Sequence, residues 1–328
     1  MRGVHLCAAA VVLGIGAGGA ALANDSTATL GAGGLVLTES ADIRMASEDL
    51  HISRKIVRVR YSFINDSAEP ITTRVAFPLP DADFESLADT QVAWPSADSG
   101  NVVGFKVTID GKAVKPELER KAVYQGEDVT AVLKRLGVPL AYRGHELGEA
   151  LKDLPEAAQA ELIERGLAQI SEHHASAAWT LKSTFHWRQT FPAGRPVTVE
   201  HEYRPVAGAA FTNPETYASD MERYDAEYCL DGATRAGIAR RLNEEKAREG
   251  DTAMLMLYFV DYVLTTGRNW KGPIGKFRLT IDKGHPKNLL SLCMEGVRKT
   301  GPTTFMVERT DFEPDRDLSL MFIEPPAQ

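Results

Sequence analysis

Four histidines are the side chains whose chemistry is most versatile, because imidazole binds metals and exchanges protons near neutral pH. His173 and His174 end a helical pattern, while His186 and His201 lie on successive predicted strands. A metal site would form if all four converged. Their spacing does not require it, and His145 with its following glutamate lacks the second histidine of an H-E-x-x-H motif. Surface or cross-strand polar pairs, for instance His186 near Glu200 or Glu202, are the simpler interpretation.

Two acidic stretches could collect oxygen ligands around calcium. The first is Asp311, Glu313, Asp315 and Asp317, and the second is Asp220, Glu222, Asp225 and Glu227. In the first stretch Pro314 interrupts the pattern, and glycine and a distal bidentate acid are missing. A solvated turn before the last strand is therefore favoured. In the second, the tyrosines nearby favour packing of a loop onto a sheet.

Other catalytic signatures are absent from the sequence. Gly31, Gly33 and Gly34 fit neither a dinucleotide-binding nor a phosphate-loop pattern, and they favour a flexible entry to the first strand. G-x-S-x-G is not found, and neither of the last two cysteines has a histidine nearby in the sequence. The sequence therefore predicts no catalytic residue, no cofactor and no metal ligand.

The amino-terminal residues have the pattern of a cleaved signal peptide. Arg2 precedes an apolar run from Leu6 to Ile15, and the small residues that follow include Ala21-Leu22-Ala23. We expect cleavage between Ala23 and Asn24 and export to the periplasm. The apolar run is too short to span a bilayer as a helix, so the mature chain, which begins at Asn24, is not expected to be membrane-spanning.

Cleavage would also remove one of three cysteines. Cys7 is lost with the signal peptide, which leaves Cys229 and Cys293 in a compartment that permits oxidation. A structural disulfide is the favoured interpretation, and two buried reduced thiols are the alternative. A bridge of this span would stabilise the fold by about 4 kcal/mol through restriction of the unfolded chain.

The charge composition of the chain limits the classes of partner that it is expected to bind. The chain has 328 residues, with 37 Lys+Arg against 45 Asp+Glu and a net charge of -8. This balance repels phosphate backbones and argues against a nucleic-acid partner. We therefore expect the partner to be a small ligand or an envelope protein.

Alternating apolar residues predict strands through most of the first half. Val57, Val59, Tyr61 and Phe63 share one face, and the chain returns through residues 71–79 after a turn, so we expect an antiparallel pair. Another strand ends at Asp110-Gly111, which favours a two-residue turn. Leucines at helical spacing predict a helical insertion at about 125–174, in which Asp153 is the expected N-cap of a helix.

The second half is also predicted to be rich in strands. Its strands are expected at 255–264, 276–281, 289–293, 304–309 and 318–323, with a helix near 233–247 after an irregular acidic stretch. We therefore expect a mainly β fold with a helical insertion (α+β) and two antiparallel sandwich-like units. The expected division is 1–23 as signal peptide, 24–205 as the first unit and 206–328 as the second.

Several short motifs resemble a known family of exported proteobacterial proteins. They are Leu30-Gly31-Ala32-Gly33-Gly34-Leu35, Phe77-Pro78-Leu79-Pro80, Asn269-Trp270-Lys271-Gly272-Pro273 and Lys299-Thr300-Gly301-Pro302. These are similar to domain-of-unknown-function family 4424, and the resemblance implies an exported protein without an assigned activity. The first half also loosely resembles the β-sandwich of the vault/inter-alpha-trypsin type. The DxSxS metal motif of the adhesion domain that commonly follows that sandwich is missing from the sequence.

Two functions are consistent with these patterns. A non-catalytic binding or scaffolding protein of the cell envelope is favoured, because the sequence combines β-rich units with an inserted helical element and lacks a catalytic constellation. A periplasmic hydrolase that depends on carboxylates or a metal is the alternative.

Overall fold

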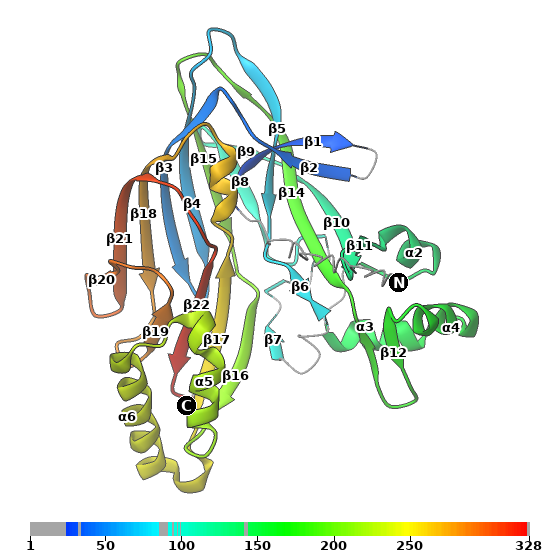
Figure 1. Ribbon diagram of the computed structural model, residues 1–328, viewed down its shortest axis with the longest axis vertical. Coiled ribbons are helices and arrows are strands. Elements are labelled where there is room, and N and C mark those ends of the chain that lie inside the picture. Colours follow the sequence, from blue (N-terminus) through cyan, green and yellow to red (C-terminus); the bar gives the residue numbers. More distant parts are fainter. Residues whose placement is uncertain are drawn as a thin grey trace, which may run out of the picture.

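The computed structural model describes residues 24–31, 34–84, 91–93, 95–96, 98, 100–140 and 144–326. It shows the expected β-rich α+β fold, with 46% of residues in strands and 21% in helices. Figure 1 shows the strands gathered in long, twisted sheets and the helices in two separate places.

Sheet B is built mainly from the strongly alternating strands of the sequence. Its order is β20 (Arg298–Lys299), β21 (Thr304–Phe312), β18 (Ile274–Asp282), β3 (Ile43–Ser53), β4 (Val57–Asn65), β15 (Pro196–Tyr203), β8 (Lys106–Ile109) and β9 (Lys112–Val114). Strands β3 and β18 run parallel, and the other pairs are antiparallel. Asp110 and Gly111, both with positive φ, form the tight turn between β8 and β9 as expected.

Sheet A faces part of sheet B. Its order is β11 (Glu127–Asp128), β10 (Glu117–Tyr124), β14 (Thr180–Phe191), β5 (Ile71–Pro78), β1 (Ser26–Gly31) and β2 (Gly34–Thr38), with β6 (Ala82–Asp83) also paired to β14. The hairpin of β1 and β2 places Gly31 opposite Gly34. Gly34 has φ +95°, a conformation that suits glycine.

Sheet C covers the rest of sheet B. Its order is β19 (Leu289–Leu292), β22 (Leu318–Glu324), β17 (Leu255–Tyr262), β16 (Ala207–Thr212) and β7 (Gln91–Ala93). Phe63 and Phe277 from sheet B, Phe77 from sheet A and Phe322 from sheet C belong to one continuous core. Sheet B therefore buries one face under both other sheets and leaves its opposite face, which carries charged side chains, in solvent.

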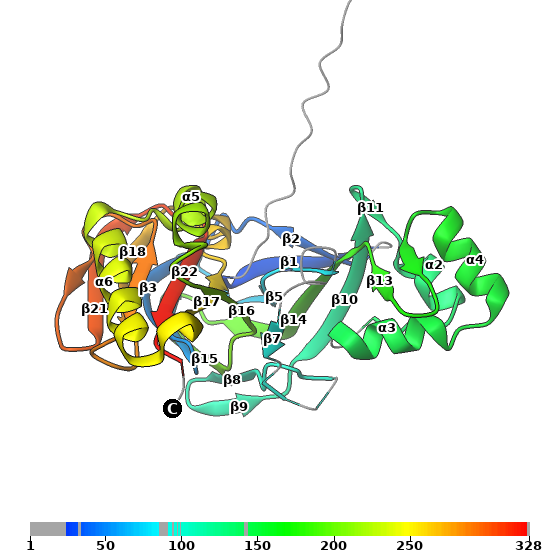
Figure 2. The same cartoon turned by 90° about the horizontal axis from the view of Figure 1, so that it is seen from below.

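The helices lie at two ends of the molecule (Figure 2). They are α2 (Thr130–Arg135), α3 (Gly144–Lys152), α4 (Glu156–Glu164), α5 (Tyr217–Tyr228) and α6 (Gly232–Glu249), with short 3-10 turns η1 (Gly250–Thr252) and η2 (Thr265–Asn269). The first three pack around Trp179 and Leu181 with the small hairpin of β12 (Ala168–Ile170) and β13 (Ala175–Ala177). The last two cover the outer face of sheet C.

The expected pairing of the strands at 55–63 and 71–79 is wrong. Strand β4 belongs to sheet B and β5 to sheet A, so the chain crosses between layers after Asn65. Both strands alternate, and both bury their apolar residues in the same core. An alternating pattern fixes which face of a strand is buried, but it does not distinguish a neighbour in the same sheet from a strand in the facing sheet.

Two local expectations about helices are also corrected. Helix α4 has Pro155 as its N-cap, and Asp153 lies before it. A helix, α5, occupies most of the acidic stretch that was expected to be irregular. Its apolar stripe is narrow, because only Met221 and Tyr228 are buried within it, and its stability depends on packing against sheet C.

The division at residue 205 stays a prediction, but the sheets join strands from both sides of it. Strand β18 of the second half lies beside β3 in sheet B, and β7 of the first half lies beside β16 in sheet C. In the part of the chain that the structure describes, no helix is long and apolar enough to cross a membrane.

Candidate functional site

Polar residues occupy inward positions where the alternation predicts apolar ones. Glu48 shares its face of β3 with Leu50 and Ile52, and His201 shares its face of β15 with Val199 and Tyr203. Both polar side chains are buried beneath the strand that enters the fold at Asn24 and Asp25, which have no exposed surface at all. We call Asn24, Asp25, Glu48, His201 and Thr266 the N-terminal cluster.

Hydrogen bonds hold both the main chain and the side chain of Asn24 in this cluster, and the main-chain carbonyl of Asp25. The main-chain N–H of Asn24 donates to Thr266 Oγ1 at 2.5 Å, and the Thr266 hydroxyl donates to the Asn24 carbonyl at 2.7 Å. The side-chain amide of Asn24 donates to Glu48 Oε2 at 3.0 Å. Trp270 Nε1 donates to the carbonyl of Asp25 at 2.6 Å.

The cluster holds more acid than base. His201 Nε2 lies 3.0 Å from Asp25 Oδ1, and burial raises the pKa of Asp25 while His201 opposes that shift. Burial raises the pKa of Glu48 to about 8, against the opposing hydrogen bonds from Asn24 and Tyr262. Among the described residues, Asp25 Oδ2 and His201 Nδ1 have no hydrogen-bond partner. A buried acid beside a histidine can transfer a proton, but this pair is sealed from solvent.

The other histidines do not join His201. His186 is on β14 in sheet A, with Nδ1 2.7 Å from a guanidinium nitrogen of Arg74, and burial followed by that positive charge lowers its pKa. Its expected partners Glu200 and Glu202 lie in sheet B instead, because β14 and β15 belong to different sheets. His173 and His174 are exposed near the turn between β12 and β13. Within the described residues, no group of three or more metal-ligating side chains comes together.

Residues of the two acidic stretches make hydrogen bonds and ion pairs that hold neighbouring segments. Asp317 Oδ1 accepts from the main-chain N–H groups of Leu264 and Thr265 at 2.9 Å each, next to η2. Asp225 pairs with Arg235 of α6 at 2.8 Å. Of the glycines near β1, Gly33 lies outside the described residues.

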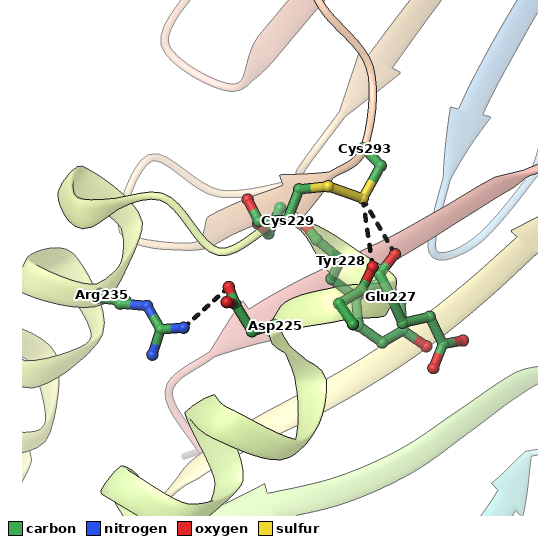
Figure 3. The surroundings of a disulfide bond; sticks show 8 residues. Asp225, Glu227, Tyr228, Cys229, Arg235 and Cys293 are labelled. Atoms are coloured by element: carbon green, nitrogen blue, oxygen red, sulfur yellow. Dashed lines mark hydrogen bonds and ion pairs between the residues drawn. A yellow bond between two sulfur atoms is a disulfide. The ribbon is translucent and has the colours of Figure 1, made fainter.

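A disulfide joins Cys229 and Cys293, as Figure 3 shows. Cys229 ends α5 in a left-handed conformation, and Cys293 directly follows β19. The Cys293 sulfur lies 3.3 Å from the carbonyl oxygen of Glu227. The bridge thus fastens the end of α5 to the edge of sheet C. Of the expected cleavage residues, Ala23 lies outside the described residues, and Asn24 is in the N-terminal cluster.

The solvent face of sheet B carries a row of alternating charges. Opposite positions on five adjacent strands are occupied by Glu308, Arg278, Asp49, Arg60 and Glu200. Arg278 lies 3.0 Å from Glu308 and 3.4 Å from Asp49, and Arg60 lies 2.5 Å from Glu200. Both arginines of this row are therefore paired with acids across the strands, and three acids against two arginines leave one net negative charge.

The neighbouring row is different and has a hollow above it. Thr310, Lys276, Ser47 and Ser62 lie opposite one another on β21, β18, β3 and β4. Small side chains between long charged ones leave a cavity of about 550 Å³, which all four residues line together with Asp49, Arg60, Arg278 and Glu308. Among the described residues, the ammonium of Lys276 has no hydrogen bond or ion pair. We call this the sheet B hollow.

A β-bulge helps to shape the hollow. The register of β3 against β4 shifts between Met45 and Ser47, and Gly275 packs against the bulged residue. A Cβ atom at Gly275 would lie 2.8 Å from the carbonyl oxygen of Ala46. The bulge turns Ser47 toward solvent and Glu48 toward the core.

Sequence reasoning missed both sites. Glu48 and His201 could have been found as ionisable residues on the apolar faces of strands. The hollow could not, because its four polar residues come from strands whose order in the sheet the sequence does not reveal.

The chain is similar to proteins that are already known. The fold is similar to that of a Legionella pneumophila protein whose crystal structure bears the description "putative nutrient binding protein". The two chains are 16% identical with a TM-score of 0.46, and the match covers 91% of this chain and 69% of the other. No curated protein matches the sequence. The looser resemblance to a vault/inter-alpha-trypsin sandwich stays a prediction. The model of the Domain of unknown function (DUF4424) family matches residues 23–321, and the chain belongs to that family.

Proposed function

We propose that this protein is an exported, non-catalytic binding protein of the cell envelope, which takes a small hydroxylated carboxylate in the sheet B hollow. The observation that carries the proposal is the ammonium of Lys276, which is unpaired among the described residues and lies beside three hydroxyl groups. The charges of the adjacent row are already paired, so the ammonium of Lys276 is free to receive an anion.

The chemistry of the lining selects the ligand class. A lysine ammonium donates charge-assisted hydrogen bonds to a carboxylate. The hydroxyls of Ser47, Ser62 and Thr310 can each donate to and accept from ligand hydroxyls. A volume of about 550 Å³ is large enough for a sugar acid of six carbons.

The hydrolase alternative has weaker support. The acid and histidine that could transfer protons, Asp25 and His201, are fully buried side chains, so a substrate has no contact with them. The hollow itself presents hydroxyls whose neighbours are paired charges, and this arrangement suits binding.

Calorimetry with gluconate tests the proposed site. Gluconate should bind the mature chain, while glucose, which lacks the carboxylate, and acetate, which lacks the hydroxyls, should bind more weakly. Lys276→Gln should weaken gluconate binding by about tenfold to a hundredfold, as expected for the loss of a hydrogen bond to a charged group. Lys112→Gln is the matched control, because Lys112 is an exposed lysine on β9.

Equal binding of gluconate by the Lys276→Gln variant and the unchanged protein would refute the site. Failure of all three probes to bind would refute the ligand class.

Export is a separate part of the proposal. The support for it is the signal-peptide pattern with Ala21-Leu22-Ala23 before Asn24. Intact-mass measurement of protein recovered from the periplasm should give a chain that begins at Asn24. A full-length chain that stays in the membrane fraction contradicts this.

A further inference from the structure

The N-terminal cluster holds more acidic than basic side chains in the core. Asp25 and Glu48 are buried acids, whereas His201 is the one basic side chain among the cluster residues. Unpaired charge in an apolar interior is costly, and proteins usually provide a counter-charge with hydrogen bonds. The side chains of the cluster leave one buried carboxyl without a cation.

The missing cation would be made by proteolysis. The main-chain nitrogen of Asn24 is buried and lies 2.5 Å from Thr266 Oγ1, while the side chain of the same residue bonds Glu48. Cleavage after Ala23 would convert that nitrogen from a neutral amide into an α-ammonium with three donors. The protonated amine would belong to Asn24, the residue whose main chain bonds Thr266 and whose side chain bonds Glu48.

We propose that the α-ammonium of Asn24, released by signal-peptide cleavage, is the buried counter-charge of Glu48 and Asp25 and completes the folded core. The cleaving enzyme is a signal peptidase of the host. Water supplies its oxygen to the carboxyl of Ala23, the peptide bond to Asn24 breaks, and the freed amine takes up a proton. The inference rests on the export part of the proposed function and is independent of the sheet B hollow.

The contacts around the first two residues agree with a fixed terminus. Asn24 is held by hydrogen bonds at three points, which are its main-chain nitrogen, its carbonyl oxygen and its side-chain amide. Trp270 and His201 hold Asp25 in the same way. Gly267 makes room for the side chain of Asn24, because a Cβ atom at Gly267 would lie 3.0 Å from the side-chain nitrogen Nδ2 of Asn24. A strand that merely entered the sheet would not need such specific contacts.

The test compares two exported forms of the whole chain. One is the natural precursor, and the other carries one glycine inserted between Ala23 and Asn24, so that cleavage leaves the ammonium one residue away from its site. Intact mass first establishes the amino terminus of each. The inserted glycine should raise the unfolding equilibrium constant by about tenfold or more, because a buried charge loses its partner.

Glu48→Gln in both forms isolates the ion pair. It should destabilise the natural form by a larger factor than the glycine-extended form, because the natural form alone holds the ion pair. Glu127→Gln, at an exposed glutamate of β11, is the control and should affect both forms equally. An equal effect of Glu48→Gln in the two forms overturns the proposal.

A chemical readout does not depend on stability. Reductive methylation at neutral pH, followed by peptide mapping, should leave the α-amino group of the folded natural form at least about tenfold less modified than that of the unfolded protein. The glycine-extended terminus should react readily. A natural terminus that reacts as fast when folded as when unfolded, or a mature chain that begins at another residue, overturns the proposal. Loss of gluconate binding would test the hollow and leave this inference unaffected.

Discussion

At the scale of single residues, the main feature is the placement of ionisable groups inside the apolar core. Glu48 and His201 lie at strand positions that the alternation assigns to apolar residues, and Asn24 bonds to Glu48. Such groups make the stability of the fold depend on pH, because their proton binding differs between the folded and unfolded chains.

Glu48 provides a prediction with a definite sign. Burial raises its pKa from 4.5 to about 8 when the nitrogen of Asn24 is an amide, so the folded state holds a proton that the unfolded state releases. Between these values, stability should fall as pH rises. In a form with a tag before Asn24, Glu48→Gln should reduce this decline by at least about 1 kcal/mol between pH 5 and 8.

Urea unfolding at several pH values measures the effect. Glu127→Gln, on the exposed strand β11, should leave the decline unchanged. The natural mature form should show a shallower decline than the tagged form, since a nearby ammonium lowers the pKa of Glu48. A steeper decline in the Glu48→Gln variant would show that the sign is wrong.

At the scale of elements, two local devices fix how neighbouring segments fit. The bulge in β3 allows β18 to approach closely through Gly275, and the disulfide fastens the end of α5 beside β19. Neither device is part of the regular hydrogen-bonding pattern of the sheets. Each one sets the position of a surface, namely the sheet B hollow and the cover of sheet C.

Gly275→Ala tests the close approach. The added methyl group would lie 2.8 Å from a main-chain oxygen of β3, so the strands must separate, and we expect a loss of about 1–3 kcal/mol in unfolding free energy. Gluconate binding should weaken as well, because Lys276 is the next residue. Gly301→Ala is the control, since its Cβ would have ordinary contacts of 3.5 Å or more. Equal stability of the two variants would contradict this account.

Cys229→Ser tests the bridge. The cysteines are separated by 64 positions, and loss of a loop closure of this length should reduce the unfolding free energy by about 2–4 kcal/mol. Thermal or urea unfolding measures it, and Cys293→Ser should give the same loss. Thiol titration of the denatured, unreduced protein should find no free sulfhydryl, and two free thiols per chain would refute the bridge.

At the scale of the whole molecule, the three main sheets share one core, while the helices have cores of their own. Trp179, Leu133 and Leu162 belong to the cluster around α2–α4, separate from the core that joins the sheets. Segments with a separate, smaller cluster open more readily than paired central strands.

Limited proteolysis should therefore cut first within residues 125–174. The exposed turns of this insertion should be cleaved while the strands of sheet B stay intact, and mass spectrometry of the early fragments identifies the site. Cleavage that begins within β4 or β18 would contradict this order. Cleavage that begins near residues 206–217 would show that β16, at an outer position in sheet C, opens first.

The sequence by itself determined the strands, the insertion and the family. Alternation over residues 57–63 and 276–281 corresponds closely to β4 and β18, because burial of one sheet face leaves a direct period-two trace. The helix spacing at 147–167 likewise marks α3 and α4. The predicted loss of Cys7 with a signal peptide left Cys229 and Cys293 as the expected pair, and the structure joins these two in a disulfide.

Only the tertiary structure decided which strands are neighbours, and the two candidate sites depend on that order. Ser47 and Lys276 meet because β3 and β18 pair in parallel across more than two hundred residues of sequence, a contact that leaves no local pattern. Asn24 meets Glu48 and Thr266 for the same reason. The local sequence pattern indicates whether a side chain is buried or exposed to solvent. Which residue it contacts is determined by the packing of the whole chain.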